Sequence, residues 1–264
     1  MTTWDPATYL AYADERSRPF LDLLARVDGD PATITDLGCG PGHLMAPLRA
    51  RWPHAAIAGV DSSPEMIERA RAEHAADGVT YICADLTSWE PATPVDLLVS
   101  NATLQWVPGH LEILPRLAGA VAPGGTLAFA VPGNFDEPSH VLLRDLAGRA
   151  PYAAHTDAVV HPSSHDGATY LAALAAASAA QWCVDAWETT YLHVLHGEDP
   201  VLRWILGTGA RPVVQALPED LRARFIAEYA ALLRVAYPAR PYGTVLPFRR
   251  VFVVAARAET DPPA

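Results

Sequence analysis

The chain of 264 residues is long enough to bury a substantial core, in one large domain or in a domain with an added cap. Half of its residues are hydrophobic and 19% are charged, as in soluble globular proteins, and no apolar run approaches the ~20 residues of a membrane span. A net charge of −11 argues against a nucleic-acid partner. Every basic residue is arginine, which excludes lysine Schiff-base chemistry, and three scattered cysteines indicate neither a disulfide framework nor a zinc site.

The chain begins with a polar and aromatic stretch and a first helix. Met1 to Tyr12 carries Asp5 and no basic residue, which is not the pattern of a secretory signal, so we expect a cytoplasmic protein. Leucines at helical spacing predict a helix over 18–27, with Pro19 in its first turn.

The first half then alternates strands and helices. Apolar runs predict strands over 33–37, 55–60, 80–83, 95–100 and 126–131. Helices are expected over 42–52, from Ser63 onward and over 111–120, and Pro123-Gly124-Gly125 is predicted to be a turn. This alternation predicts a Rossmann-like α/β fold, doubly wound around a mostly parallel sheet.

The second half is less regular. Helices are predicted over 141–148, 169–177, 200–207 and 218–237, and long strands over 182–195 and 245–257. We expect one domain over 1–264, with a seven-stranded sheet whose last strand is antiparallel. A helical insertion from about 134–178 and 198–243 is expected to cap the ligand edge and bind substrate.

The organising stretch is Ala32 to Leu44, A-T-I-T-D-L-G-C-G-P-G-H-L, where a strand breaks into three alternate glycines. Gly38, Gly40 and Gly42 permit a tight turn and close approach of a ligand to backbone. The spacing is not the G-x-G-x-x-G of dinucleotide binding, and Asp36 would repel a phosphate. An acid beside such a loop favours a cationic ligand.

Polar residues recur where the first four strands end. Asp36, Asp61, Asp85 and Asn101 each stand at the carboxyl end of a strand. In parallel sheets, ligands bind beyond that edge. The four positions therefore predict one ligand site.

Three motifs resemble class I S-adenosylmethionine-dependent methyltransferases: D-L-G-C-G-P-G at 36–42, G-V-D-S-S-P-E-M at 59–66 and A-D-L at 84–86. The resemblance implies S-adenosylmethionine as cofactor and S-adenosylhomocysteine as product. It implies a glycine loop at the methionine part, Asp61 on the ribose hydroxyls and Asp85 at the adenine amino group. The cofactor-binding residues so predicted are Arg18, Asp36, Gly38, Gly40, Asp61, Ser62, Met66, Asp85, Leu86 and Asn101.

Further motifs are similar to trans-aconitate 2-methyltransferases, including W-D-P-x-x-Y-L at 4–10, S-N-A-T-L-Q-W-V at 100–107, T-G-A-R-P at 208–212 and P-F-R-R-V-F-V-V-A at 247–255. That family forms a monomethyl ester of trans-aconitate. Residues 149–166 match only loosely, and Arg249 stands where a proline is expected before the arginine matched by Arg250; these departures concern the acceptor and not the cofactor. No role is assigned to residues 149–166 or to Arg249, and the sequence does not indicate an oligomeric state.

The acceptor residues predicted on this basis are Tyr9, Trp106, His110, Arg211 and Arg250. Arg211 and Arg250 are expected to bind the carboxylates that do not react, with a solvated surface position as the alternative for each. Tyr9 and Trp106 either wall the transfer site or belong to the core. His110 either contacts substrate or caps a helix.

The roles of two arginines near the start remain open. Arg18 either binds the cofactor carboxylate or forms a surface pair with Glu15, and Arg16 is its alternate or a substrate ligand.

The predicted reaction needs no catalytic side chain. A carboxylate is ionised at neutral pH, so alignment and exclusion of water suffice and no general base is assigned. His155, His161 and His165 do not match a metal motif, and Cys39 is expected to pack rather than react. Alternatives are a methyltransferase for another O or N acceptor, a nicotinamide oxidoreductase and a non-catalytic cofactor-binding module.

Overall fold

The computed structural model describes residues 13–176 and 182–259, with side chains described from residue 17. The chain divides into two compact units. The sheet unit comprises Arg16–Val131, Ser164–Glu188 and Arg250–Ala264, and the helical unit comprises Met1–Glu15, Pro132–Ser163 and Thr189–Arg249. The sequence prediction assigned residues 134–178 to the cap, whereas residues 164–176 belong to the sheet unit. Whether the helical unit acts as a cap stays a prediction.

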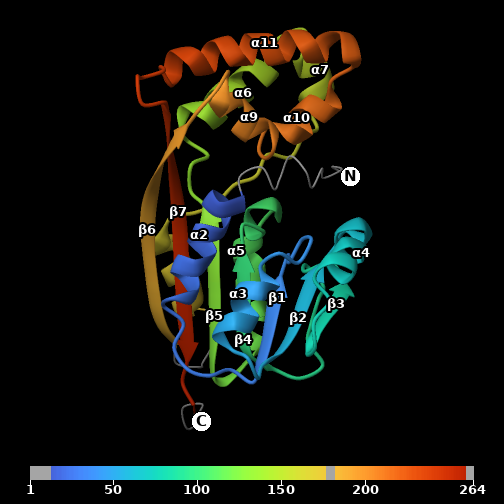
Figure 1. Cartoon of the computed structure of the whole chain (residues 1–264), viewed down its shortest axis with the longest axis vertical. Coiled ribbons are helices and arrows are strands. Elements are labelled where there is room, and N and C mark those ends of the chain that lie inside the picture. The colour runs from blue at the N-terminus through green and yellow to red at the C-terminus, as the bar shows by residue number, and fades with distance from the viewer. Residues whose placement is uncertain (1–12, 177–181, 260–264) are drawn as a thin grey trace. The chain divides into compact units, whose positions relative to one another are not determined.

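The seven strands form one sheet in the order β3-β2-β1-β4-β5-β7-β6. The first five strands pair in parallel, and β7 runs in the opposite direction (Figure 1). The predicted fold class is therefore confirmed. The strands are β1 (Thr33–Leu37), β2 (Ala56–Asp61), β3 (Val79–Cys83), β4 (Val95–Asn101), β5 (Val121–Pro132), β6 (Trp182–Leu195) and β7 (Thr244–Arg257).

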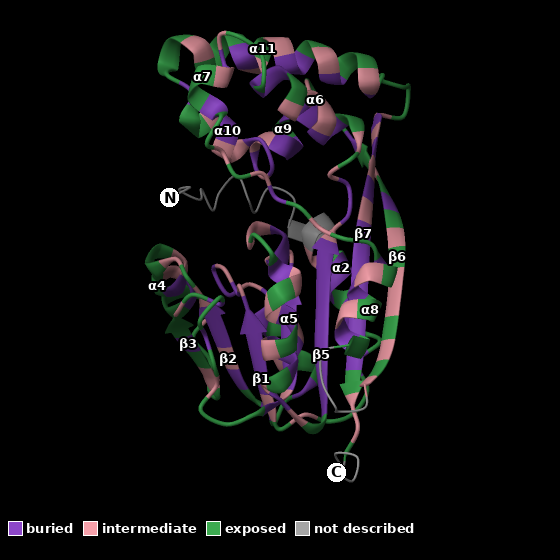
Figure 2. Cartoon of the chain, turned by 180° about the vertical axis from the view of Figure 1, so that it is seen from behind, coloured by how far each residue is buried: buried purple, intermediate pink, exposed green. Residues whose placement is uncertain are grey.

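Helices cover both faces of this sheet. α2 (Ala13–Leu24) and α3 (Met45–Arg51) lie on the face toward the viewer in Figure 1, and α5 (His110–Gly119) and α8 (Gly167–Ala176) cover the opposite face (Figure 2). α4 (Pro64–Glu73) packs on β2 and β3. Its N-cap is Ser63, as the sequence predicts, and the Ser63 hydroxyl accepts a hydrogen bond from the Met66 N–H at 3.3 Å.

The central strands carry the core of the sheet unit. β4 and β5 are almost continuously buried, because helices cover both faces of the sheet (Figure 2). The predicted turn at Pro123-Gly124-Gly125 is wrong: these residues lie inside β5. Val95 pairs with Val121 and Leu97 pairs with Thr126, so an irregularity in the pairing, rather than a break in the strand, accommodates the glycines.

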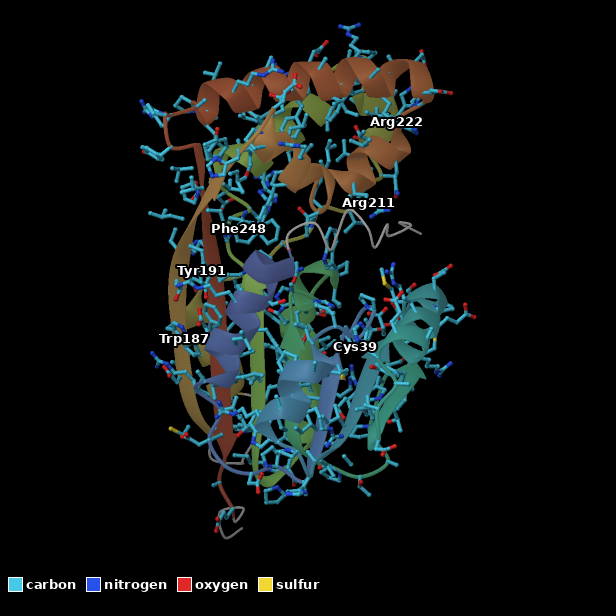
Figure 3. All side chains as sticks on the ribbon, viewed as in Figure 1. Cys39, Trp187, Tyr191, Arg211, Arg222 and Phe248 are labelled. Atoms are coloured by element: carbon cyan, nitrogen blue, oxygen red, sulfur yellow. The ribbon has the colours of Figure 1, made fainter. Side chains whose placement is uncertain are left out.

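Aromatic stacking joins β6 to β7 within the sheet unit. The Trp187 ring, which is labelled in Figure 3, stacks on the Phe252 ring with centroids 4.8 Å apart. The Arg26 guanidinium lies 4.6 Å from the centroid of the Trp187 ring. Arg26 also donates to Asp185 at 2.7 Å. The residues after α2 are thereby fixed against β6.

The helical unit has its own core, built from Tyr152, Trp204, Phe225 and Tyr229. Its helices are α6 (Pro138–Ala147), α7 (Ala153–Thr156), α9 (Pro200–Leu206), α10 (Arg211–Ala216) and α11 (Glu219–Ala236). The sequence did not predict α7 and α10, which are too short for apolar periodicity to be visible. Arg222 on α11 donates to the carbonyls of Val214 and Leu217, which fixes α11 to the end of α10 (Figure 3). Among the described residues no helix has the length and apolar character to cross a membrane.

Candidate functional site

The glycine loop after β1 has a backbone conformation that residues other than glycine rarely adopt. Gly38, Gly40 and Gly42 have φ values of +76°, +55° and +85°. A Cβ on Gly38 would overlap the Thr103 side chain, whereas one on Gly40 would have nothing within 4 Å. The N–H groups of Gly38 and Cys39 donate to the Val60 carbonyl at 2.7 and 3.0 Å. The loop is therefore anchored at its start and presents bare backbone at Gly40.

Asp61 at the end of β2 is fixed by both of its carboxylate oxygens. Oδ2 accepts the Gly40 N–H and Oδ1 accepts the Ser63 N–H, each at 2.9 Å. A carboxylate oxygen has two lone pairs, so each oxygen can accept one further bond. Asp61 is thus oriented beside the glycine loop with capacity left for a pair of hydroxyl groups.

Asp85 follows β3 and is exposed. Its Oδ1 accepts from the Thr87 N–H and hydroxyl, both at 2.8 Å, and these bonds hold the pKa of the Asp85 carboxyl below its usual value. The neighbouring Leu86 is 9% exposed and packs in the core of the sheet unit, which leaves little of its surface for a ligand. Met66 is half-buried and Ser62 is exposed. The cofactor contacts predicted for these four residues stay predictions.

Strand register brings the predicted polar residues onto one face of the sheet. Asp36 on β1 pairs with Gly59 on β2 and with Val99 on β4. Asp61 lies two residues after Gly59, and Asn101 two residues after Val99. Because side chains alternate along a strand, all three polar residues point to the same side, at neighbouring strand ends. The register therefore places these three residues on one side of the sheet, and the ligand site predicted for them and for Asp85 stays a prediction.

Asp36 is a buried acid. Its side chain is 1% exposed, and burial, followed by repulsion from Asp61, raises its pKa from 3.8 to about 7. Within the described part of the chain its Oδ2 atom has no hydrogen-bond partner. A buried carboxylate in this state favours a cationic ligand that donates hydrogen bonds.

Two further buried acceptors lie at the end of β4 and in the 3-10 helix that follows it. Asn101 Oδ1 and Gln105 Oε1 have no partner among the described residues, and the two residues are 9% and 5% exposed. Gln105 Nε2 donates to the Ala102 carbonyl at 2.6 Å, and Ala102 has a positive φ of 55°. Such strain is typical of functional segments. The N-A-T-L-Q-W motif is visible in the sequence, but nothing in it distinguishes Gln105 as a ligand.

Together these features fit an amino acid-bearing cation. Among the described residues, no group donates a hydrogen bond to the buried oxygens Asp36 Oδ2, Asn101 Oδ1 and Gln105 Oε1. An ammonium group can supply the missing donors. Asp61 retains lone pairs for hydroxyl groups, and Gly40 leaves its backbone open. S-adenosylmethionine carries both an ammonium group and a pair of ribose hydroxyl groups. The residues present therefore fit the predicted cofactor.

His110 does not match the substrate contact predicted for it. Its ring is 1% exposed, with Nδ1 3.3 Å from the Val107 carbonyl and Nε2 2.7 Å from the Tyr170 hydroxyl. Burial lowers the pKa of its imidazole. Tyr170 also accepts the His165 N–H at 3.1 Å. Both ring nitrogens are engaged at the start of α5, which favours the alternative role at the helix terminus.

The two arginines predicted to bind the acceptor differ in burial. Arg250 on β7 is 5% exposed, so it is not a solvated surface residue. Arg211 is half-buried and begins α10 of the helical unit (Figure 3). Their binding role stays a prediction.

The remaining predicted residues are unsupported or undescribed. The Arg18 side chain is 70% exposed and lies 3.9 Å from Asp22, one turn along α2. Arg18 therefore forms a surface ion pair, as the alternative prediction had it, but its partner is Asp22 rather than the predicted Glu15. Trp106 is half-buried in a short 3-10 helix, Leu104–Trp106. Tyr9 and the Arg16 side chain lie outside what the structure describes.

Neither a nucleophile nor a metal site emerges from the other candidates. Cys39 is 2% exposed (labelled in Figure 3), and burial and the nearby acids raise the pKa of its thiol, so it is unsuited to nucleophilic attack. Over residues 13–176 and 182–259, no three histidine, cysteine or acidic side chains group as metal ligands.

Comparison with known proteins identifies clear relatives. A family profile described as a methyltransferase domain matches residues 34–125. The chain is 54% identical to a trans-aconitate 2-methyltransferase of Streptomyces avermitilis, over 96% of each chain. It is 52% identical to one of Streptomyces coelicolor, over 97% of this chain and 88% of the relative. A third relative of that name, from Mycobacterium sp. (strain KMS), is 50% identical over 96% of this chain and 98% of its own.

Solved structures share the fold at low sequence identity. A methyltransferase in complex with a Haloferax volcanii methyltransferase activator matches with a TM-score of 0.60 and 18% identity, over 97% of this chain and 96% of that chain. The YcgJ protein from Bacillus subtilis matches with a TM-score of 0.57 and 14% identity, over 93% of this chain and all of that chain. These likenesses establish the fold.

Proposed function

The chain belongs to the trans-aconitate 2-methyltransferase family, and we propose that it methylates one carboxylate of trans-aconitate or of a closely similar small polycarboxylate. The observation that carries the proposal is the extent of the similarity. The methyltransferase-domain profile matches only 34–125, whereas the relatives match 96% of the chain or more, including the segments of the helical unit. The similarity thus extends well beyond the cofactor motifs.

S-adenosylmethionine is the methyl donor, and it supplies an electrophilic methyl group on a sulfonium centre. In this proposal Asp36, Asn101 and Gln105 accept hydrogen bonds from its ammonium group, and Asp61 accepts from the ribose hydroxyls. Gly40 allows the backbone to approach the methionine part. The unpartnered buried acceptors and the open space at Gly40 support this assignment.

The acceptor needs no deprotonation by the protein. A carboxylic acid with a pKa near ~4 is ionised at neutral pH, so its oxygen is already nucleophilic. Attack joins a carboxylate oxygen to the methyl carbon while the carbon–sulfur bond breaks and its electron pair returns to sulfur. The engaged nitrogens of His110 and the buried thiol of Cys39 are consistent with a reaction that uses neither as a base.

The protein therefore contributes alignment and charge recognition. Arginine pairs with carboxylates through two parallel hydrogen bonds, so Arg250 and Arg211 remain the proposed ligands of the carboxylates that do not react. Burial of Arg250 supports its part, because a buried guanidinium binds anions more strongly than one in water. A cytoplasmic location and the absence of a nucleic-acid partner stay predictions.

Labelled methyl transfer tests this function. The protein is incubated with methyl-labelled S-adenosylmethionine and a panel containing trans-aconitate, other di- and tricarboxylates, phenols and amines. We expect label in trans-aconitate or a close analogue, released by mild base as an ester is. Stable label in a phenol or an amine would instead establish a different acceptor class, and cofactor binding without transfer would indicate a non-catalytic protein.

A further inference from the structure

The neighbouring strands β1 and β4 are connected in two different ways along their length. Among the described residues, their backbone pairing runs from Ile34 opposite Leu97 to Asp36 opposite Val99. The strand order β3-β2-β1-β4-β5 changes direction between these two strands (Figure 1), and parallel sheets bind ligands at such a point. The contacts that follow Asp36 therefore shape the cofactor site.

Two side-chain hydroxyl groups continue the connection beyond the last backbone pair. Ser100 Oγ donates to the Leu37 carbonyl at 2.8 Å. Thr103 Oγ1 lies 3.3 Å from the Gly38 carbonyl oxygen and 3.2 Å from the Asn101 carbonyl oxygen. A hydroxyl group has one proton, so the two carbonyls share it. Thr103 thereby links the segment after β4 to the glycine loop.

Thr103 also packs directly against the glycine loop. Its side chain occupies the space that a Cβ on Gly38 would need. Gly38 is fixed in turn, because its N–H donates to the Val60 carbonyl at 2.7 Å. The glycine loop therefore gives Thr103 a firm support, through both a hydrogen bond and packing.

The residues on either side of Thr103 carry acceptors that lack a donor among the described residues. Asn101 lies two positions before Thr103, and Gln105 lies two positions after it. Gln105 Nε2 donates to the Ala102 carbonyl, so the backbone next to Thr103 determines where Gln105 Oε1 points. Ala102 has a φ of +55°, and such a backbone persists only where the surrounding structure fixes it. Thr103 provides that restraint.

We propose that Thr103 is a positioning residue of the cofactor site. Its hydroxyl fixes the segment after β4 against the glycine loop and so sets the positions of the Asn101 and Gln105 side-chain oxygens. The inference rests on the proposed function, because it takes these oxygens as acceptors of the ammonium group of S-adenosylmethionine. Thr103 acts on the amino acid part of the cofactor alone, since backbone N–H groups of other segments hold Asp61, the proposed ribose ligand.

The test removes the hydroxyl and keeps the shape of the side chain. Thr103→Val retains the branched Cβ that packs beside Gly38, and the dissociation constant of S-adenosylmethionine in a calorimetric titration should rise about 3- to 10-fold. Thr103→Ser keeps the hydroxyl and should bind as the wild type does. 5′-Methylthioadenosine has the ribose and adenine but no amino acid part, so it should bind the wild type and Thr103→Val equally.

Thr33→Val is the matched control, because it removes a hydroxyl that joins the same two strands at their opposite end. Thr33 Oγ1 accepts the Asp96 N–H and donates to Asp96 Oδ2, each at 3.0 Å. Thr33→Val should lower the melting temperature and leave the dissociation constants of both ligands unchanged. It therefore separates a general loss of stability from a loss of positioning.

The possible outcomes distinguish this inference from the proposed function. Unchanged affinity of Thr103→Val for S-adenosylmethionine would overturn the inference and leave the function intact. An equal loss with 5′-methylthioadenosine, or a loss in Thr103→Ser or Thr33→Val as large as in Thr103→Val, would also overturn it. The expected losses without methyl transfer to any polycarboxylate would support the inference and refute the function. A wild-type protein that does not bind S-adenosylmethionine would overturn both.

Discussion

The most informative perturbation of the site is Asp36→Asn, because Asp36 is the buried acid on which the cofactor assignment depends. The substitution keeps the shape of the side chain and removes its negative charge. It therefore separates the electrostatic contribution of Asp36 from its packing. Two quantities should respond, namely the pH dependence of stability and the pH dependence of cofactor binding.

The stability effect follows from the pKa of Asp36. The folded chain raises this pKa from 3.8 to about 7, so the folded state binds the proton more tightly than the unfolded state does. The free energy of unfolding therefore falls as pH rises from ~4 to ~7, and the full penalty is present above that range. A shift of about 3 pH units at about 1.4 kcal/mol each amounts to about 4 kcal/mol. This is an upper bound for the gain in Asp36→Asn at pH 8, because the new N–H group also needs an acceptor.

The binding effect has the opposite sign. A cationic ligand prefers ionised Asp36, so binding must displace the proton below pH ~7. The dissociation constant of S-adenosylmethionine should then rise about tenfold for each pH unit below 7 in the wild type. In Asp36→Asn it should be weak and nearly independent of pH.

Urea unfolding of the ligand-free protein and calorimetric titration of the cofactor, each at pH 5 to 8, measure the two effects. Glu68→Gln, at an exposed acid on α4, is the control and should follow the wild type. Equal cofactor affinity at pH 5 and pH 8 in the wild type would refute the reasoning. So would an Asp36→Asn variant that keeps the wild-type pH dependence of stability.

Three other substitutions test separate parts of the account. Asp61→Ala should weaken S-adenosylmethionine binding by about 1–3 kcal/mol through loss of charge-assisted hydrogen bonds; unchanged affinity in a calorimetric titration would remove Asp61 from the site. Arg250→Ala should raise the KM of the acceptor far more than that of the cofactor in steady-state kinetics, and equal increases would indicate a structural role instead. Tyr170→Phe removes the hydroxyl that bonds His110 and His165, so thermal denaturation should show a loss of about 1–3 kcal/mol; an unchanged melting temperature would mean that this network does not stabilise the segment after β4.

The fold was readable from the sequence wherever a physical signal is local. The bounds predicted for β1 and β6 agree with the structure, because apolar patterning and flanking turn residues delimit them. The turn at 123–125 failed because glycine and proline signal a break, whereas pairing of Val121 and Thr126 with β4 on either side keeps this segment within the strand. Tertiary pairing is not visible in a local pattern.

The candidate site shows the same division. Asp36, Asp61 and Asn101 were predictable, since parallel strands bring their carboxyl ends to one edge. Gln105 was not, because what marks it is a buried side-chain oxygen that lacks a hydrogen-bond partner among the described residues. For His110 the sequence suggested a ligand contact, because this residue closely follows the predicted site residues Asn101 and Trp106. Only the structure reveals that both nitrogens of its ring are engaged by Tyr170 and Val107.

The central claim is that this chain forms a methyl ester on trans-aconitate. The most direct measurement is a single turnover with trans-aconitate and S-adenosylmethionine carrying a ¹³C-labelled methyl group, followed by carbon NMR of the products. The account predicts one new resonance in the range of carboxylate methyl esters, in an amount equal to the S-adenosylhomocysteine formed. Unlabelled trans-aconitate, with bound cofactor that stays intact or transfers its methyl group to another acceptor class, would contradict it.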